Sequence, residues 1–198
     1  MQQKLLLASA SPRRQQLLQQ IGVAFDLVEH SVHEQRQAGE SATQFTRRMS
    51  EEKGRSALDK WQDNEGRVVL AADTAVVCAG EIMGKPKDRN DAIAMLSQLS
   101  GAEHTVFSAV TVGTVDSRQT LVSQTTVEFR SIQQQEIINY WNTGEPRDKA
   151  GAYGIQGYAA VFVRSLSGSY SGVMGLPLYE TAQLLQAYSI TGTGSLNS

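Results

Sequence analysis

A carboxylate within an apolar segment is the first residue of this chain that could do chemistry. Asp73 interrupts the otherwise apolar, β-type run 67–77. A buried carboxylate needs a cation, a partner or an open cleft, because burying it alone costs several kcal/mol. A cap or a turn is the simpler alternative for Asp73. The sharper interpretation is a general base or a metal ligand.

The segment 9–14, Ser-Ala-Ser-Pro-Arg-Arg, is predicted to bind an anion such as phosphate. Residues 5–8 form an apolar run typical of a buried strand, and Ser11 followed by Pro12 is typical of a helix start. The N–H groups of that start, with hydroxyls and guanidiniums beside them, suit an anion. A capped helix on a solvated surface is the alternative. The candidate binding residues here are Ser9, Ser11, Arg13 and Arg14.

Composition limits the classes of partner. The 198 residues suffice for one large domain or two small lobes with a core. A formal charge of −2 gives no global attraction to nucleic acid or to an anionic membrane, and no apolar run is long enough to cross a bilayer. The single cysteine, Cys78, lies in an apolar run and is predicted to be a core residue. One cysteine fits a reducing compartment, so we expect a cytoplasmic protein. From the charge and the short apolar runs we expect neither nucleic-acid nor membrane partners.

Hydrophobic periodicity and turn signals predict alternating strands and helices. Ser41 and Gln44 form a capping box, after which a long charged helix runs to Trp61 with Lys53 inside it. The predicted strands are 5–8, 23–28, 67–77, 81–83, 105–115, 120–130 and 159–166, with 105–115 and 120–130 as a hairpin. The other predicted helices start at residues 12, 91, 133 and 178.

Two further segments have polar motifs. In the loop 144–157, four glycines around Tyr153 and Gln156 are typical of backbone that approaches a ligand closely, and a flexible surface loop is the alternative. His30 and His33 precede Glu34, but no other Cys or His cluster accompanies them, so a histidine metal site is not expected.

Taken together, these residues resemble the Maf family of nucleoside triphosphate pyrophosphatases. The matching pieces occur in family order and cover the chain except its tail, which predicts a single domain over 1–188 and a frayed tail over 189–198. The pieces are 9–14, Glu34, Glu52-Lys53, Ala72-Asp73-Thr74, 84–88, 148–157 and Gly175-Leu176-Pro177.

The resemblance implies a fold and a reaction. The fold is α/β, with a mixed, elongated β-sheet flanked by helices and a central nucleotide-binding cleft between two lobes (Maf/ITPase-like). The reaction is hydrolysis of the α–β phosphoanhydride of a nucleoside triphosphate by a homodimer with a divalent cation, Mg²⁺ or Mn²⁺. By position, Asp73 resembles the catalytic acid-base residue, and Glu34, Lys53 and Lys85 match other active-site positions. Glu34 and Asp73 are the candidate metal ligands.

Three positions resemble the family group that acts on dTTP and UTP: Arg13, Thr74 and Gln156. The amide of Gln156 can meet the O4 and N3–H edge of uracil or thymine, whereas a glutamate would suit the cationic base of 7-methyl-GTP. His33 departs from the acid that close relatives often carry before Glu34. This change could weaken or shift metal binding, but with Glu34 kept it is not expected to abolish activity. The biological role would be nucleotide-pool cleansing or cell-division arrest. The alternatives are a nucleotide-binding regulator of septum formation with little turnover, or a relative that prefers 7-methyl-GTP.

Overall fold

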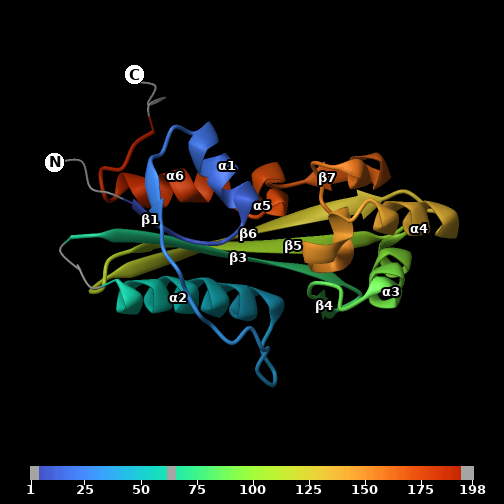
Figure 1. Cartoon of the computed structure of the whole chain (residues 1–198), viewed down its shortest axis with the longest axis horizontal. Helices are drawn as coiled ribbons and strands as arrows, with labels where there is room; N and C mark the ends of the chain where they lie inside the picture. Colours follow the sequence, from blue (N-terminus) through green and yellow to red (C-terminus); the bar gives the residue numbers. More distant parts are fainter. Residues whose placement is uncertain (1–4, 62–65, 193–198) are drawn as a thin grey trace. The chain divides into compact units, whose positions relative to one another are not determined.

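The computed structural model describes residues 5–61 and 66–192. It is an α/β fold with a mixed seven-stranded sheet flanked by helices, which confirms the predicted fold class (Figure 1). The strand order is β2-β1-β3-β5-β6-β7, and β4 pairs with β3. The strands are β1 (Leu5–Ala8), β2 (Phe25–Leu27), β3 (Val68–Cys78), β4 (Glu81–Met83), β5 (Glu103–Gly113), β6 (Arg118–Phe129) and β7 (Val163–Ser167).

The five predicted helices are present and begin within two residues of the predicted positions. The α-helices are α1 (Pro12–Gln20), α2 (Ala42–Lys60), α3 (Arg89–Leu99), α4 (Gln134–Asn142), α5 (Tyr170–Met174) and α6 (Leu178–Gln186), and the 3₁₀ helices are η1 (Glu145–Asp148), η2 (Ala150–Ala152) and η3 (Tyr158–Phe162). Helix α5 and the three 3₁₀ helices were not predicted. None of the helices in the described ranges combines the length and apolar character needed to cross a membrane.

The chain divides into two compact units, and each is discontinuous in sequence. The first unit comprises Met1–Asp73, Ser108–Ser123 and Gly175–Ser198, and the second comprises Thr74–Phe107 and Gln124–Met174.

In the first unit, β1 runs parallel to both β2 and β3. The register pairs Ala8 with Ala71, so the chain beyond Ala8 and the chain beyond Ala71 leave the paired strands at the same edge. Helices α1 and α6 lie on one face of these strands and α2 on the other (Figure 1).

Helix α2 begins as the sequence predicts. The Ser41 hydroxyl accepts from the Gln44 N–H, and the Gln44 side chain accepts from the Ser41 N–H, which completes the capping box. Its inner face packs on β1 and β3 through a buried apolar cluster. That cluster consists of Leu6, Ala8, Ala57, Leu58, Val69 and Ala71. The packing fixes which residues of α2 face the sheet, and Lys53 is one of the buried ones.

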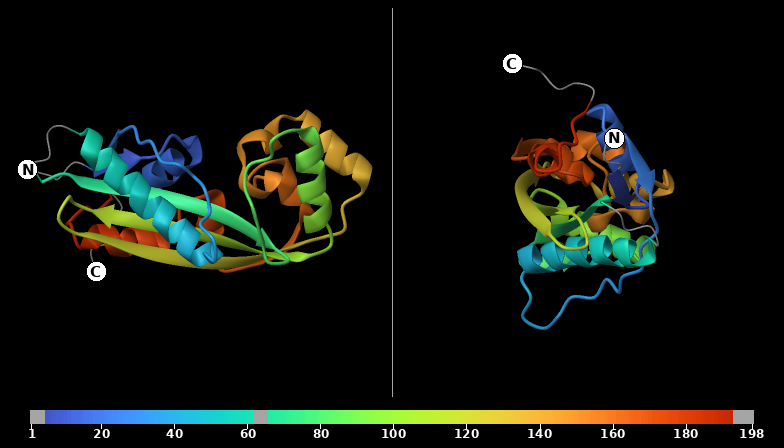
Figure 2. Two further views of the ribbon diagram at one scale, coloured as in Figure 1. Left: turned by 90° about the horizontal axis from the view of Figure 1, so that it is seen from below. Right: turned by 90° about the vertical axis from the view of Figure 1, so that its left-hand side faces the viewer.

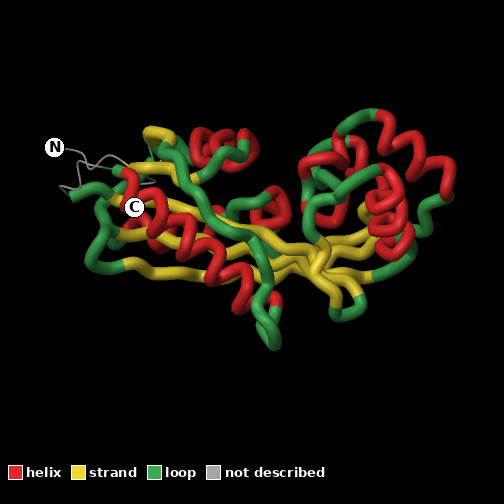
Figure 3. The backbone as a smooth tube through the Cα atoms, turned by 60° about the horizontal axis from the view of Figure 1, so that its bottom comes forward, coloured by secondary structure: helices red, strands yellow, loops and turns green. Residues whose placement is uncertain are grey.

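A long loop, 28–41, connects β2 to α2 and carries Glu34. It is drawn as the green segment that leads to the start of α2 in Figure 3. Because this loop forms no strand and so has no ladder of backbone hydrogen bonds, its position depends on side-chain contacts.

The second unit is built around aromatic side chains. Helices α3 and α4 pack side by side (Figure 2). His104, Phe129 and Tyr153 make edge-to-face contacts with ring centroids 4.8–5.4 Å apart. Cys78 is buried in this unit, as predicted for a core residue.

The predicted strand 159–166 is wrong in its first half. Residues 158–162 form the 3₁₀ helix η3, and only Val163–Ser167 pairs with β6. The physical reason is the spacing of the buried residues. Ala159 and Phe162 face the interior, three positions apart, while Val161 between them is 66% exposed. That spacing suits a 3₁₀ turn and not an alternating strand. The predicted tail falls largely on 193–198, outside the described residues.

Candidate active site

The predicted anion segment begins at the edge of the sheet where β1 ends. Strand β1 has parallel neighbours on both sides. The connection through α1 leads from β1 to β2 on one side, and the connection through α2 leads from β2 to β3 on the other side. In open α/β sheets, ligands bind at the carboxyl ends of strands at such a point. From the register of Ala8 with Ala71, Asp73 lies at the same edge as the start of α1.

Ser9 and Arg14 organise the start of α1. The buried Ser9 hydroxyl accepts from the Ser11 N–H at 3.3 Å and from Arg14 at 3.3 Å. Arg14 Nε also donates to the Gly175 carbonyl at 2.7 Å, which joins the Gly175-Leu176-Pro177 motif to the segment 9–14. Ser11 is the N-cap, as predicted, although its hydroxyl makes no capping bond within the described part of the chain. The serines and Arg14 therefore form one hydrogen-bonded group.

Lys53 joins the two predicted carboxylates. Its Nζ lies 2.7 Å from Asp73 Oδ1 and 2.6 Å from Glu34 Oε1. Lys53 and Asp73 are buried, whereas the Glu34 side chain is 52% exposed. Helix α2, strand β3 and the loop 28–41 thus each contribute one residue to a single charged cluster.

The charges in this cluster act on one another. Burial raises the pKa of the Asp73 carboxyl above its ordinary value, and the ammonium of Lys53 opposes that rise. Burial lowers the pKa of the Arg14 guanidinium, and the charge of Asp73 opposes that shift. A buried carboxyl with a raised pKa that accepts a hydrogen bond from a lysine is a candidate general base.

The donor set also suits a divalent cation. Mg²⁺ is usually held by one or two carboxylates together with substrate phosphates, and Asp73 and Glu34 supply the two carboxylates. Lys53 contacts one oxygen of each, so the ammonium and a metal would share the same pair of residues. Within 5–61 and 66–192, no group of three or more His, Cys, Asp or Glu side chains is arranged to hold a metal ion. The fit is therefore to a metal held jointly with a phosphate ligand.

Of the remaining predicted residues, Arg13 lies on α1 of the first unit, next to Arg14, and the other three belong to the second unit. Thr74 is half-buried on β3, Lys85 is exposed after β4, and Gln156 is exposed between η2 and η3. The structure brings together Ser9, Ser11, Arg14, Glu34, Lys53 and Asp73 in the first unit.

Sequence reasoning missed the residues that hold the loop of Glu34. The Arg48 guanidinium binds Glu40 through two contacts of 2.7 and 2.8 Å, and it donates to the Gln35 carbonyl at 3.0 Å. The hydrogen bond from Arg48 lowers the pKa of Glu40 to about 2. The clamp therefore ties α2 to the residue next to Glu34. An arginine and a glutamate eight positions apart across a helix start give no local signal of this pairing.

Two of the four glycines of the loop 144–157 are explained by contacts within the fold. A Cβ on Gly154 would come within 2.7 Å of Lys149 Cε, and a Cβ on Gly157 would overlap the carboxylate of Glu145. These glycines make room for neighbouring side chains, where the sequence predicted room for a ligand. Glu145 was not identified from the sequence. The only signal was the spacing of Gly154 and Gly157, which leaves room for another side chain inside the turn.

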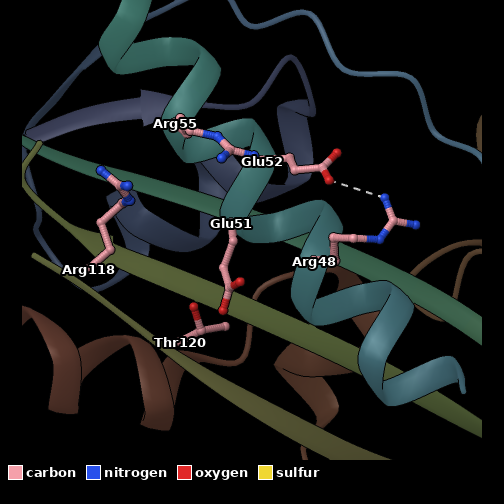
Figure 4. A pocket seen from close by; sticks show the side chains of 6 residues that line it. All are labelled: Arg48, Glu51, Glu52, Arg55, Arg118 and Thr120. Carbon is pink, nitrogen blue, oxygen red and sulfur yellow. Dashed lines mark hydrogen bonds and ion pairs between the residues drawn. The ribbon is translucent and has the colours of Figure 1, made fainter. Parts of the chain in front are cut away.

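A separate hollow of about 500 Å³ lies beside α2, and none of the predicted site residues lines it (Figure 4). Its lining residues are Arg48, Glu51, Glu52, Arg55, Arg118 and Thr120. Arg48 pairs with Glu52 at 3.2 Å, one turn along α2, and the Thr120 hydroxyl bonds to Thr111 at 2.9 Å. The lining mixes three arginines with two glutamates, and carboxylates among the arginines are typical of a solvated groove and not of a phosphate site.

Comparison with known proteins gives matches along nearly the whole chain. A model of the family described as "Maf-like protein" matches residues 4–188. The protein named dTTP/UTP pyrophosphatase of Vibrio vulnificus (strain YJ016) is 45% identical over 185 residues, covering 93% of this chain and 98% of the relative. Proteins with the same name from Saccharophagus degradans and Photobacterium profundum are 47% and 46% identical, covering 94% and 93% of this chain and 89% and 96% of their own. The Staphylococcus aureus Ham1 protein superposes with a TM-score of 0.44 at 12% identity, over 64% of this chain and 72% of that chain, which is too distant to support an argument.

Proposed function

The chain belongs to the family of Maf-like proteins, and we propose that it is a nucleoside triphosphate pyrophosphatase that acts on dTTP and UTP. Relatives about as long as this chain, at 45–47% identity, carry the name dTTP/UTP pyrophosphatase. The observation that carries the proposal is the buried Asp73 beside Lys53, at the sheet edge where α1 begins.

Asp73 supplies the base in this proposal. A water oxygen forms a bond to the α-phosphorus, the bond from that phosphorus to the bridging oxygen breaks, and pyrophosphate leaves. The carboxylate of Asp73 takes the proton of the attacking water. The raised pKa of Asp73 supports the assignment, because a base is most effective when its pKa approaches the working pH.

The cations supply the charge that the substrate demands. A triphosphate carries about four negative charges, so its site needs guanidinium and ammonium groups and oriented N–H donors. Arg13, Arg14 and Lys53 are the candidates in the first unit, and Lys85 is the candidate in the second. A divalent cation, when bound by Asp73 and Glu34, would neutralise phosphate charge and polarise the phosphoryl oxygens.

Gln156 is proposed to recognise the base. Its amide offers one donor and one acceptor, which match the O4 and N3–H edge of thymine or uracil. The exposed side chain supports this role, since a residue that reads a ligand must be accessible in the unliganded protein. Arg13 and Thr74 are the other two positions proposed to define this specificity.

Two further proposals concern assembly and location. The resemblance to the Maf family supports a homodimer. The single buried cysteine supports a reducing compartment, and we place the protein in the cytoplasm.

The test is pyrophosphate release from a panel of dTTP, UTP, CTP and 7-methyl-GTP, with Mg²⁺ or Mn²⁺, for the wild type and for Asp73→Asn. We expect turnover of dTTP and UTP, with a loss of about 10²- to 10⁴-fold in kcat for the variant. Asp26→Asn, on the neighbouring strand β2, is the matched control and should retain activity.

Other outcomes would redirect the proposal. Preference for 7-methyl-GTP would overturn the role of Gln156 and leave the reaction in place. Tight nucleotide binding without turnover of any of the four would favour the regulator of septum formation.

A further inference from the structure

Glu145 places its carboxylate inside the turn that carries Gln156. Its Oε1 accepts from the Tyr140 hydroxyl at 2.7 Å, and its Oε2 accepts from the Tyr158 N–H at 2.9 Å. Tyr140 comes from α4 and is 3% exposed, so the carboxylate is anchored to the packed interior of the second unit.

The Tyr140 hydroxyl makes a second bond to the same turn. It accepts from the Gly154 N–H at 3.1 Å while it donates to Glu145. Burial and the hydrogen bond to Glu145 raise the pKa of Tyr140 above its ordinary value, so the phenol keeps its proton and the donor role is fixed. The two ends of the turn, Gly154 and Tyr158, are therefore held by one pair of side chains.

The fit is close enough to exclude other side chains on the turn. A Cβ on Gly157 would overlap the Glu145 carboxylate, and a Cβ on Gly154 would lie 3.2 Å from Glu145 Oε1 and closer still to Lys149. Two glycines leave the backbone of the turn permissive, and Glu145 fills the space that their missing side chains leave.

Gln156 lies between the two held residues and is itself exposed. We propose that Glu145, together with Tyr140, is a positioning residue that orients Gln156 toward the pyrimidine edge and so sets the base selectivity. This inference rests on the proposed function, because it takes Gln156 as the residue that reads the base.

The physical basis is the angular demand of base recognition. Hydrogen bonds weaken steeply when the donor angle departs from linear, and a glycine-flanked turn without an anchor would present the Gln156 amide in many orientations. Binding would then have to order the turn, which lowers affinity for the matching base more than for others.

Three variants test the inference, with kcat and KM measured for dTTP and CTP. Glu145→Ala should lower the ratio of kcat/KM for dTTP over CTP by about tenfold, through KM for dTTP, with kcat changed by less than about threefold. Tyr140→Phe should lower the ratio by about threefold, since Glu145 keeps its bond to Tyr158. Glu145→Gln should restore most of the ratio, because an amide oxygen can still accept from Tyr158.

A direct measurement of order keeps the test independent of catalysis. Amide hydrogen exchange of residues 154–158 in the unliganded protein should quicken by about tenfold in Glu145→Ala. Glu128→Gln is the matched control, because it alters a carboxylate of the same unit that binds Arg164 and Ser165 and not the turn. It should change neither the exchange nor the ratio.

Gln156→Ala separates the two hypotheses. If Gln156→Ala abolishes the selectivity and Glu145→Ala leaves both exchange and selectivity unchanged, the positioning role is wrong and the base reader stands. If Glu145→Ala quickens exchange while neither variant moves the selectivity, the role of Gln156 is wrong, and the proposed control of selectivity falls with it. In the double variant, Glu145→Ala should add no further loss of selectivity, because both changes act on one contact.

Discussion

The cluster around Lys53 and the turn around Glu145 hold their polar groups in opposite ways. In the first, an ammonium lies 2.7 Å from one carboxylate and 2.6 Å from another, and most of this charge is buried. In the second, a carboxylate accepts from a neutral phenol and a backbone amide. The first arrangement depends on a balance of charges, whereas the second depends on shape and on groups that keep their protons.

The residues that support the two regions differ in the same way. The loop of Glu34 is fixed by the ionic pair of Arg48 and Glu40. The turn of Gln156 follows Tyr153, whose hydroxyl bonds to the buried His104 at 2.8 Å. We infer that chemistry and recognition respond differently to pH and to neutral substitution, and the following predictions test that difference.

Removing the charge of Lys53 should have the largest effect on stability and activity. Lys53→Met leaves the buried Asp73 without its ammonium, and breaking a buried pair in this way costs about 3–5 kcal/mol of unfolding free energy. The pKa of Asp73 should rise, because Lys53 opposes the rise that burial causes. The acid limb of the pH profile of kcat/KM should therefore move to higher pH, together with a loss of about 10²-fold in activity.

Lys60→Met is the matched control for this prediction, since it removes an exposed lysine from the same helix. It should leave the pH profile in place and change stability by a few tenths of a kcal/mol at most. An unshifted acid limb in active Lys53→Met protein would show that Asp73 is not the group whose titration governs the rate.

The stability of the second unit should fall in acid because of His104, which bonds to Tyr153 before the turn of Gln156. Burial lowers the pKa of His104 to about 4, whereas the unfolded chain takes up that proton near pH 6.5. The stability that the neutral histidine confers is full above pH 6.5 and is lost as the pH falls toward 4. Between pH 7 and pH 5 this loss amounts to about 2 kcal/mol. Urea unfolding at several pH values measures it.

His104→Leu should flatten this part of the stability curve, while lowering stability at pH 7 because the Tyr153 hydroxyl loses its partner. Glu40 and Glu136, with pKa values of about 2, lose their contributions below pH 4.5 and so do not act in this window. An equal slope for the wild type and the variant would contradict the assignment to His104.

The elements that position both regions could be predicted where their signals are local. Ser11 with Pro12 marks the start of α1, and Ser41 with Gln44 marks that of α2, because a cap depends on residues one turn apart. Asp73 stands out because a carboxylate in an apolar strand is costly whatever surrounds it.

The contacts that complete the two regions could not be predicted. Lys53 looks like any lysine on a charged helix until packing buries it beside Asp73. Glu145 lies in a loop whose glycines could equally serve a ligand, and only the folded turn shows that its carboxylate fills their space. The 3₁₀ helix after Gly157 was hidden because its apolar residues also suit a strand. The first two depend on residues that the fold brings together, and the third depends on which of its apolar residues the fold buries.

The smallest effect is expected at the edge of the charged cluster. Arg48→Gln removes the fork that binds Glu40 and the Gln35 carbonyl, so Glu34 should be held less firmly against Lys53. The loss should fall mainly on kcat, by about three- to fivefold, because the partly buried clamp acts on Glu34 only through the loop, and an ionic contact near the surface contributes about 1 kcal/mol or less. Steady-state kinetics with dTTP measures this loss.

Arg55→Gln is the matched control. It removes a cation from the same helix, at a residue that is exposed, and should leave kcat within about twofold. If both variants lower kcat equally, the general charge of α2 matters and the clamp does not. If Arg48→Gln alone lowers it, and the selectivity for dTTP over CTP stays unchanged, then the loop of Glu34 serves the reaction while the turn of Gln156 serves recognition.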